Sequence, residues 1–303
     1  MISLTSGKRI AIIDQNKRDC IYISEDDENG PHVDTTPEHK FEMFKKFLML
    51  DRKLSSANIR DLEAAYKSGK KEFEGKLNRK YIDGIDYVNE SLKRHLDYGT
   101  DTNISPIVDE PSYRIFVSGL SGSGKSTVIA EFLKNNPVRK GSGIFLFSPV
   151  QKDEAMDKIK NLIRINLDEV EKELKKEFTI DDIPEGSVVI FDDVESFEKK
   201  VAKQYLELRD IFLERGRHRD ISTITVSHNA CAGNLTKVSI RESQYWILFP
   251  KHNSRDTRNI LKTYGGLDKS QIDEICDMKT RWCFYKKSIP RYAIGQHSVI
   301  TYG

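Results

Sequence analysis

A glycine-rich segment near the middle of the chain carries the most specific pattern of chemistry-bearing residues. In "RIFVSGLSGSGKSTVIAEFLKNN", the residues Gly119, Gly124, Lys125 and Ser126 match the spacing G-x-x-x-x-G-K-[ST]. An apolar run precedes this loop and a helical pattern follows it, which is the context that the motif requires. The sequence therefore predicts a P-loop that binds a nucleoside triphosphate.

Each residue type in the loop has a physical role. Glycines give the backbone conformations closed to other residues, so that N–H groups point at the phosphates beside a helix N-terminus. We expect Lys125 to reach the β- and γ-phosphates, the Ser126 hydroxyl to ligate Mg²⁺ and Thr127 to approach the α-phosphate. The residues expected to bind nucleotide are Gly119, Ser121, Gly122, Ser123, Gly124, Lys125, Ser126 and Thr127.

Two acidic residues end the apolar run 188–191 in "EGSVVIFDDVESF". A carboxylate at the C-terminal tip of a buried parallel strand lies where open α/β sheets bind ligands, so we expect Asp192 to hold Mg²⁺ through water. Asp193 is the candidate to orient or deprotonate the attacking water, with Glu195 as its rival. An acidic pair after a strand can also cap a helix, but the P-loop favours the catalytic interpretation.

A polar tip follows the next apolar run, where "ISTITVSHN" ends in Ser227, His228 and Asn229. In motor NTPases the central strand ends in a polar side chain that senses the γ-phosphate, and either His228 or Asn229 could serve. The alternative is a strand-end histidine with purely structural hydrogen bonds.

The pattern around these motifs predicts an α/β fold of the P-loop NTPase (RecA-like) class, with a mainly parallel central sheet flanked by helices. Short apolar runs alternate with longer amphipathic stretches, which is typical of a parallel sheet buried on both faces. We expect strands at 115–117, 144–147, 188–191, 221–226 and 246–249, helices at 125–135, 167–178, 201–215, 255–264 and 269–278, and final strands at 281–286 and 291–294. If the run 144–147 does not lie between the P-loop strand and the strand of Asp192, the arrangement is that of NTPases with an additional central strand, which are mostly motors.

Residues 1–105 are expected to form a small α+β domain ahead of an ATPase domain at 106–303. A hairpin is expected from the runs 9–13 and 20–24 around "DQNKRD", followed by a loop at 25–37. Helical patterns cover 41–50, 59–66 and 73–95, and the stretch 97–111, rich in Gly, Asn, Pro and acids, is expected to be a linker.

Composition sets weaker limits on the class of protein. The formal net charge of +2 neither supports nor excludes a polyanionic partner. The spacing of Cys20, Cys231, Cys276 and Cys283 argues against zinc binding and against a disulfide framework, and predicts reduced thiols. No apolar run approaches the ~20 residues that span a bilayer and the N-terminus lacks the apolar stretch of a secretory signal, so we expect an intracellular protein without membrane insertion.

Five segments together resemble the FtsK–HerA superfamily and, within it, the genome-packaging ATPases of large eukaryotic DNA viruses, the poxvirus type. They are "VSGLSGSGKST", "GIFLFSPV", "VVIFDDV", "FLERGRHRDIS" leading into "TITVSHN", and "IRESQYWILFP", in the family's order over residues 112–250. The P-loop is common to many families, whereas "IFLFSPV" and the "GRH" segment are more specific. Residues 1–105 match no part of the family core.

The resemblance implies an ATP-driven motor that threads double-stranded DNA into a preformed capsid as a pentameric or hexameric ring, with a capsid or portal-vertex protein as partner. It implies a location in the host cytoplasm, in the viral factory or in the virion. Asp193 matches the catalytic acid, whereas His228 stands where the family usually has glutamine. An arginine that stabilises transition-state charge is expected at Arg217 or Arg241, often acting on the neighbouring subunit.

Basic residues also recur near the last part of the resemblance. Lys237, Arg241, Lys251, His252, Arg255, Arg258 and Lys262 are spaced along it, with Tyr245 and Trp246 nearby. Such a run is either a contact to DNA phosphates, which a motor would use because it must pass every sequence, or a solvated helix face.

Two other functions remain open from the sequence. One is a small-molecule or nucleoside kinase, although neither an acceptor pocket nor an arginine-rich lid is evident. The other is a non-motor regulatory P-loop NTPase that acts through residues 1–105.

Overall fold

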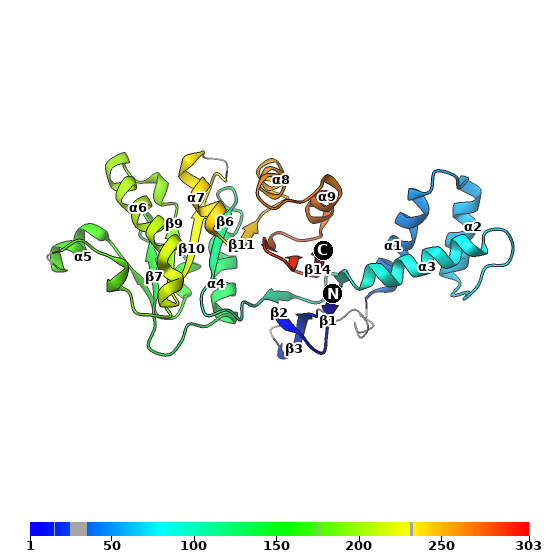
Figure 1. The fold of residues 1–303 in the computed structure, drawn as a ribbon, viewed down its shortest axis with the longest axis horizontal. Helices are drawn as coiled ribbons and strands as arrows, with labels where there is room; N and C mark the ends of the chain where they lie inside the picture. The colour runs from blue at the N-terminus through cyan, green and yellow to red at the C-terminus, as the bar shows by residue number, and fades with distance from the viewer. Residues whose placement is uncertain (15, 25–34, 175, 231–232, 303) are drawn as a thin grey trace.

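The computed structural model describes residues 1–14, 16–24, 35–174, 176–230 and 233–302. Cys231 and most of the loop expected at 25–37 lie outside these residues. The molecule is elongated, with one large sheet in its middle and a group of three helices extending from one end (Figure 1).

Within the described residues, ten strands form the large sheet in the order β4-β14-β13-β12-β11-β6-β10-β9-β7-β8. Neighbouring strands from β11 to β8 are parallel, and those from β4 to β11 are antiparallel. The bounds are β4 (His95–Asp97), β6 (Arg114–Ser118), β7 (Ile144–Phe147), β8 (Leu162–Arg164), β9 (Val188–Asp192), β10 (Ser222–Ser227), β11 (Tyr245–Leu248), β12 (Cys283–Lys286), β13 (Arg291–Ile294) and β14 (Ser298–Tyr302).

The order of the parallel strands confirms the predicted α/β class. β10 lies between the P-loop strand β6 and the acidic strand β9, while β7 lies beyond β9. The run 144–147, which forms β7, therefore does not lie between the two motifs. The additional central strand that this arrangement requires is β10.

Helices cover both faces of the large sheet, as expected for parallel strands buried on two sides. On one face, α4 (Lys125–Asn135) packs Ile129 and Phe132 against Val117 and its neighbours. On the other face lie α5 (Leu167–Leu174), α6 (Lys199–Arg215), α7 (Asn234–Glu242), α8 (Ser254–Thr263) and α9 (Lys269–Asp277).

The N-terminal region contributes two different structures. A small sheet of order β1-β3-β2-β5 consists of β1 (Ile2–Ser3), β2 (Lys8–Ile13), β3 (Asn16–Ile23) and β5 (Ile104–Pro106), and its Ile10 and Ile21 join the same apolar cluster as α4. A helical unit of α1 (Pro37–Leu50), α2 (Ser56–Lys67) and α3 (Asn78–Leu92) packs around a cluster of its own. The division of the chain at residue 105 stays a prediction.

Several expected bounds were wrong. The supposed linker at 97–111 contains β5, and the supposed helix at 73–95 begins only at Asn78, after Gly75 with φ +103°, and leaves His95 in β4. The helix expected at 167–178 ends at Leu174, and β3 begins at Asn16 inside the expected turn. Strands such as β4 and β5, of three residues each, depend on distant partners and leave little periodicity in the sequence.

No helix within the described residues combines the length and the apolar character needed to cross a bilayer.

The stability of the helical unit should depend on its own apolar cluster, and a substitution of Phe44 tests this. The side chain is fully buried and stacks on Tyr66 with ring centroids 4.4 Å apart. We expect Phe44→Ala to lower the free energy of unfolding by about 3–5 kcal/mol, because the loss of a buried aromatic ring leaves a cavity. Urea denaturation followed by circular dichroism measures the change. The control is Met49→Ala in the same helix, where the side chain is 65% exposed and the expected effect is within about 0.5 kcal/mol.

Candidate functional site

Three adjacent parallel strands bring the predicted motifs to one edge of the large sheet. In the strand register, Val226 of β10 pairs with Val117 of β6 on one side and with Asp192 of β9 on the other. The segments that follow each strand therefore emerge at the same level. These are the P-loop, the tip Ser227–Asn229 and the acidic pair.

The P-loop has a backbone that only glycine accommodates at its critical points. Gly122 and Gly124 have φ of +73° and +96°, in the region where other residues are strained. A Cβ on Gly119 would lie 2.7 Å from both the Phe249 ring and the Ser123 Oγ. Within the described residues the buried Ser123 hydroxyl has no hydrogen-bond partner. The loop is thus built as a close-fitting backbone cradle at the N-terminus of α4.

Lys125 is the cation at the centre of the site. Its Nζ donates to the carbonyl oxygens of Gly119 at 2.7 Å and Leu120 at 3.1 Å, and to Nδ1 of His228 at 3.0 Å. Burial lowers the pKa of Lys125, while the nearby carboxylates of Asp192 and Asp193 oppose that shift. Its ammonium group therefore faces the ends of all three strands.

His228 connects this lysine to the acidic pair. Because an ammonium group only donates, Nδ1 of His228 must accept, which leaves the proton of a neutral ring on Nε2. Nε2 lies 3.6 Å from Oδ2 of Asp193. Lys125, His228 and Asp193 thus form a continuous polar chain across the strand ends.

The structure separates the rival candidates by position. Asp193 lines the cavity and has a left-handed backbone with φ 50°, whereas the carboxylate of Glu195 accepts from the Ser227 hydroxyl outside the cavity lining. His228 lines the cavity, whereas Asn229 is exposed and does not. A non-glycine residue at positive φ is uncommon, and such strain concentrates at functional sites.

Carboxylates surround the position expected for a divalent cation. The Ser126 hydroxyl donates to Oδ2 of Asp153 at 2.7 Å, and the Ser148 hydroxyl donates to Oδ2 of Asp192 at 3.0 Å. Burial raises the pKa of Asp192, and the charges of Asp193 and Asp153 raise it further. Asp153 was not predicted from the sequence, because it lies in a loop after β7 with no recognisable motif.

Arg281 is a second residue that the sequence analysis missed. Its Nη2 donates to the carbonyl oxygen of Gly122 at 3.3 Å, and its guanidinium carbon lies 3.3 Å from where a Cβ on Gly124 would be. Arg281 immediately precedes Trp282 and β12, and its position over the P-loop results from the pairing of β12 with β11. The only signal in the sequence was its place at the start of an expected strand.

A cavity of about 1130 Å³ unites these groups. The predicted residues that line it are Ser121, Gly122, Gly124, Lys125, Ser126, Thr127, Asp192, Asp193 and His228, joined by Asp153 and Arg281. Gly119 and Ser123 lie beneath the loop.

The two candidate arginines are not among the residues that line this cavity. Arg217 lies in η4 (Gly216–Arg219), just before β10, and Arg241 lies at the end of α7, before β11. Since β6, β10 and β11 are parallel, both arginines lie toward the opposite edge of the sheet, where both are exposed. Within one chain neither can reach the P-loop.

The basic stretch is only partly available for contacts with a partner. Tyr245 and Trp246 are core residues of β11, 1% and 0% exposed, so neither can stack on a base. The Nζ of Lys251 donates to the Cys276 carbonyl at 2.8 Å, and Arg258 pairs with Asp273. Lys237, Arg241, Lys251, His252, Arg255 and Lys262 are exposed.

The residues of this cavity fit a nucleoside triphosphate with magnesium. A Cβ on Gly122 would meet nothing within 4 Å, so this part of the loop backbone is open to a phosphate, and Lys125 supplies positive charge beside it. Oxygen ligands from Ser126, Asp153 and Asp192 are the type that Mg²⁺ prefers. Burial first, and then the charges of Asp193 and Asp153, raise the pKa of Asp192, and a divalent cation would offset that gathered negative charge.

Comparison with solved structures finds distant likenesses. The genome packaging NTPase B204 of Sulfolobus turreted icosahedral virus 2, in complex with sulfate, is 12% identical, with a TM-score of 0.38 over 64% of this chain and 97% of B204. The pCW3 conjugation coupling protein TcpA, with ATPγS, is 12% identical, with a TM-score of 0.40 over 64% of this chain and 63% of TcpA. Likenesses at these TM-scores carry no weight for function.

No protein-family model matches the chain. Among curated proteins, the uncharacterized protein V3 of Sputnik virophage is 32% identical over 200 residues, which cover 63% of this chain and 78% of V3. At that identity over most of the relative's length, the chain belongs to the same protein family as V3 of Sputnik virophage.

Proposed function

We propose that this protein is an ATPase that binds ATP with Mg²⁺ in the cavity between the P-loop and the acidic pair. One observation carries the proposal. Lys125, on the P-loop, converges on one cavity with Asp192, the last residue of β9, and Asp193, which follows it, although β10 separates the two strands. This is the placement that phosphoryl transfer to water requires.

Each residue has a role that follows from its position. The backbone of the loop from Gly119 to Gly124 and the side chain of Lys125 bind the phosphates, and Thr127 lies one position beyond Ser126 on the cavity wall. Ser126, Asp192 and Asp153 hold the cation, which would neutralise charge on the phosphates. Asp193 orients and deprotonates water, and His228 holds Asp193 and Lys125 in register.

The proposed biological role is that of a motor of the FtsK–HerA superfamily that packages viral double-stranded DNA into a preformed capsid. It is supported by the additional central strand β10 and by the poxvirus-type segments over residues 112–250. Such a motor works as a ring of five or six subunits, docks on a capsid or portal-vertex protein and contacts DNA through phosphates. It acts in the host cytoplasm, in the viral factory or in the virion.

Exposed arginines lie at the P-loop and also at the opposite edge of the sheet, an arrangement that would let one subunit of a ring contact the nucleotide of the next. Arg281 contacts the P-loop of its own chain. Either Arg217 or Arg241, exposed at the opposite edge of the sheet, supplies the finger to the neighbouring subunit's nucleotide. A finger in trans makes hydrolysis depend on assembly.

The decisive measurement is ATP hydrolysis by the full chain with and without long duplex DNA, at low salt. We expect DNA to stimulate the wild type, and Asp193→Asn to lower kcat by about 10²–10⁴-fold while ATP affinity is retained, because general base catalysis alone is lost. The control, Asp168→Asn, changes an exposed acid on α5 and should leave the rate unchanged.

The same assay separates the other functions. Absence of DNA stimulation contradicts the motor, and a phosphorylated small-molecule product would identify a kinase. Partner binding that depends on nucleotide, without DNA stimulation, would identify a regulatory NTPase.

Alanine substitutions at two glycines with similar φ angles test whether the P-loop backbone binds nucleotide. Gly124 and Gly141 have φ of +96° and +93°, so alanine at either position should cost about 1 kcal/mol or more of stability. A Cβ on Gly124 meets Arg281 at 3.3 Å, whereas a Cβ on Gly141 meets nothing within 4 Å. We expect thermal unfolding to shift similarly in both variants and ATP affinity, measured by calorimetry, to fall only in Gly124→Ala. Equal affinities would contradict the assignment of the loop.

Arg281 has its own test. We expect Arg281→Ala to weaken ATP binding by about tenfold or more, because a charged hydrogen-bond donor beside the phosphates is typically worth about 1.5–3 kcal/mol. Arg255→Ala, an exposed arginine on α8, is the matched control. Calorimetry on both variants measures the difference, and unchanged affinity in Arg281→Ala would remove this residue from the site.

A further inference from the structure

Two histidines and an aspartate meet where the helical unit joins the large sheet. His39 lies in the first turn of α1, after the N-cap residue Thr36. His95 and Asp97 are the first and last residues of β4 and therefore point to the same face of the strand. Leu96 points to the other face and is fully buried in the main core. The three polar side chains thus come from two elements, α1 and β4, and these are separated in the sequence by α2 and α3.

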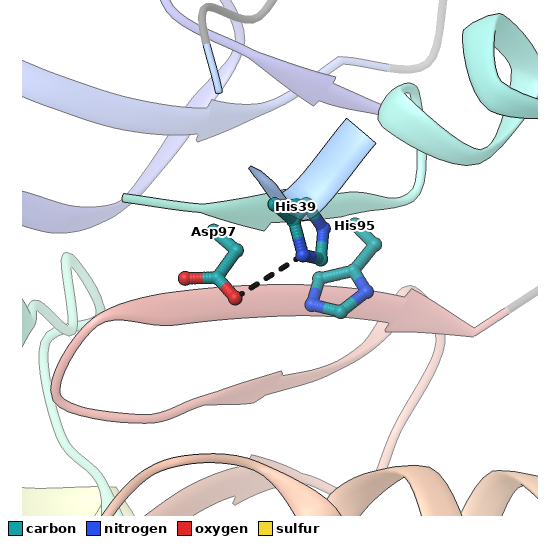
Figure 2. Close-up of side chains that lie close together, drawn as sticks. All are labelled: His39, His95 and Asp97. Atoms are coloured by element: carbon teal, nitrogen blue, oxygen red, sulfur yellow. Dashed lines mark ion pairs between the residues drawn. The ribbon is translucent and has the colours of Figure 1, made fainter. Parts of the chain in front are cut away.

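The geometry of the three side chains is compact. One ligand atom from each residue lies within 4.8 Å of the other two. The Nδ1 of His39 is 3.3 Å from Oδ2 of Asp97, and the two imidazole rings are nearly perpendicular with centroids 4.7 Å apart. Figure 2 shows the carboxylate of Asp97 and the two rings turned toward a common space.

A carboxylate from a third element lies next to His95. The Nδ1 of His95 lies 3.8 Å from Oε1 of Glu274, on α9. In the tautomer that carries its proton on Nδ1, the ring has the lone pair that binds a metal on Nε2. A carboxylate behind the distal nitrogen is the usual outer partner of a metal-binding histidine.

The contact between His39 and Asp97 also favours a cation. The Nε2 of His39 is buried and, within the described part of the chain, has no hydrogen-bond partner. No described group on that side therefore fixes the tautomer, and Nδ1 is able to present its lone pair beside the carboxylate of Asp97. Lys46 and Lys279 lie near enough to act on the histidines, but the short contact of His39 is to Asp97.

We propose that His39, His95 and Asp97 form a zinc site, with Glu274 as the outer partner of His95 and the fourth ligand position filled by water. Two imidazoles and a carboxylate are ligands that Zn²⁺ accepts, at bond lengths of about 2.0–2.2 Å. Tetrahedral ligands at that distance lie about 3.3–3.5 Å apart, and the 3.3 Å between His39 and Asp97 already has this value. The ligand atoms of the remaining pairs lie within 4.8 Å of one another.

Zinc suits this site better than the other metals that accept such ligands. Magnesium and calcium prefer oxygen ligands, whereas imidazole nitrogen provides two of the three ligand atoms. The same three residue types also bind catalytic Fe²⁺ where open positions face a substrate. None of the three lines the cavity of the P-loop. The site is therefore separate from the P-loop cavity, and zinc bound there would join the start of α1 to the edge strand β4.

The test is metal content of the full chain, purified without a polyhistidine tag and dialysed against metal-free buffer. Mass spectrometry should find about one zinc per chain, as for a single mononuclear site. His95→Ala and Asp97→Ala should each lose it, and His218→Ala, an exposed histidine outside the cluster, should keep it. Zinc should raise the Tm of the metal-free wild type and leave that of His95→Ala unchanged.

Two further measurements keep the proposal open to contradiction. If His95→Ala does not fold, cobalt(II) added to the metal-free wild type must give the visible absorption of a tetrahedral site. Lys125→Ala should keep its zinc, so that failure of the ATPase proposal and failure of this one remain separate. A wild type that stays metal-free after zinc addition, that holds only iron, or that gives no cobalt spectrum overturns the site.

Discussion

The register of three parallel strands is the constraint on which the site depends. Because Val226 pairs with Val117 on one side and with Asp192 on the other, the P-loop and the acidic pair can meet only across the tip of β10. The side chains of β6, β9 and β10 are almost wholly buried, and a shift by one residue would turn every one of them to the wrong face. The hydrophobic core thus fixes the relative height of Lys125 and Asp192 before any ligand is involved.

That constraint gives His228 its importance. A side chain at this tip must bridge two strands, and imidazole does so with two nitrogens of opposite character, accepting from Lys125 and facing Asp193 with the other. Glutamine, the usual residue here in the genome-packaging ATPases that the sequence resembles, also carries a donor and an acceptor on one planar group. The histidine therefore provides the same pair of hydrogen-bonding groups.

The part of the site that lies in local motifs was predictable from the sequence, and the rest was not. Gly119 to Thr127 and Asp192 each belong to a strand–loop pattern with a physical reason behind it. The strand order was open in the sequence, which stated only what would follow if the run 144–147 lay outside the two motifs. Arg281 and Asp153 were missed because their positions result from β12 pairing with β11 and from a loop after β7, which are non-local facts. The proposed zinc ligands were missed for the same reason. The cysteine spacing gave no sign of zinc, and His39 meets His95 only after α1 and α3 pack together.

The large sheet also links the two proposals mechanically. β4, which carries His95 and Asp97, belongs to the same sheet as β6 and β9, but it pairs with β14 through only three residues. The helical unit has an apolar cluster separate from the main core. A metal ion that ties α1 to β4 would make the unit follow the sheet as a rigid body, whereas without it the unit would pivot on the strand. If residues 37–92 bind a capsid or another subunit, the tie determines whether movement at the nucleotide site reaches that partner.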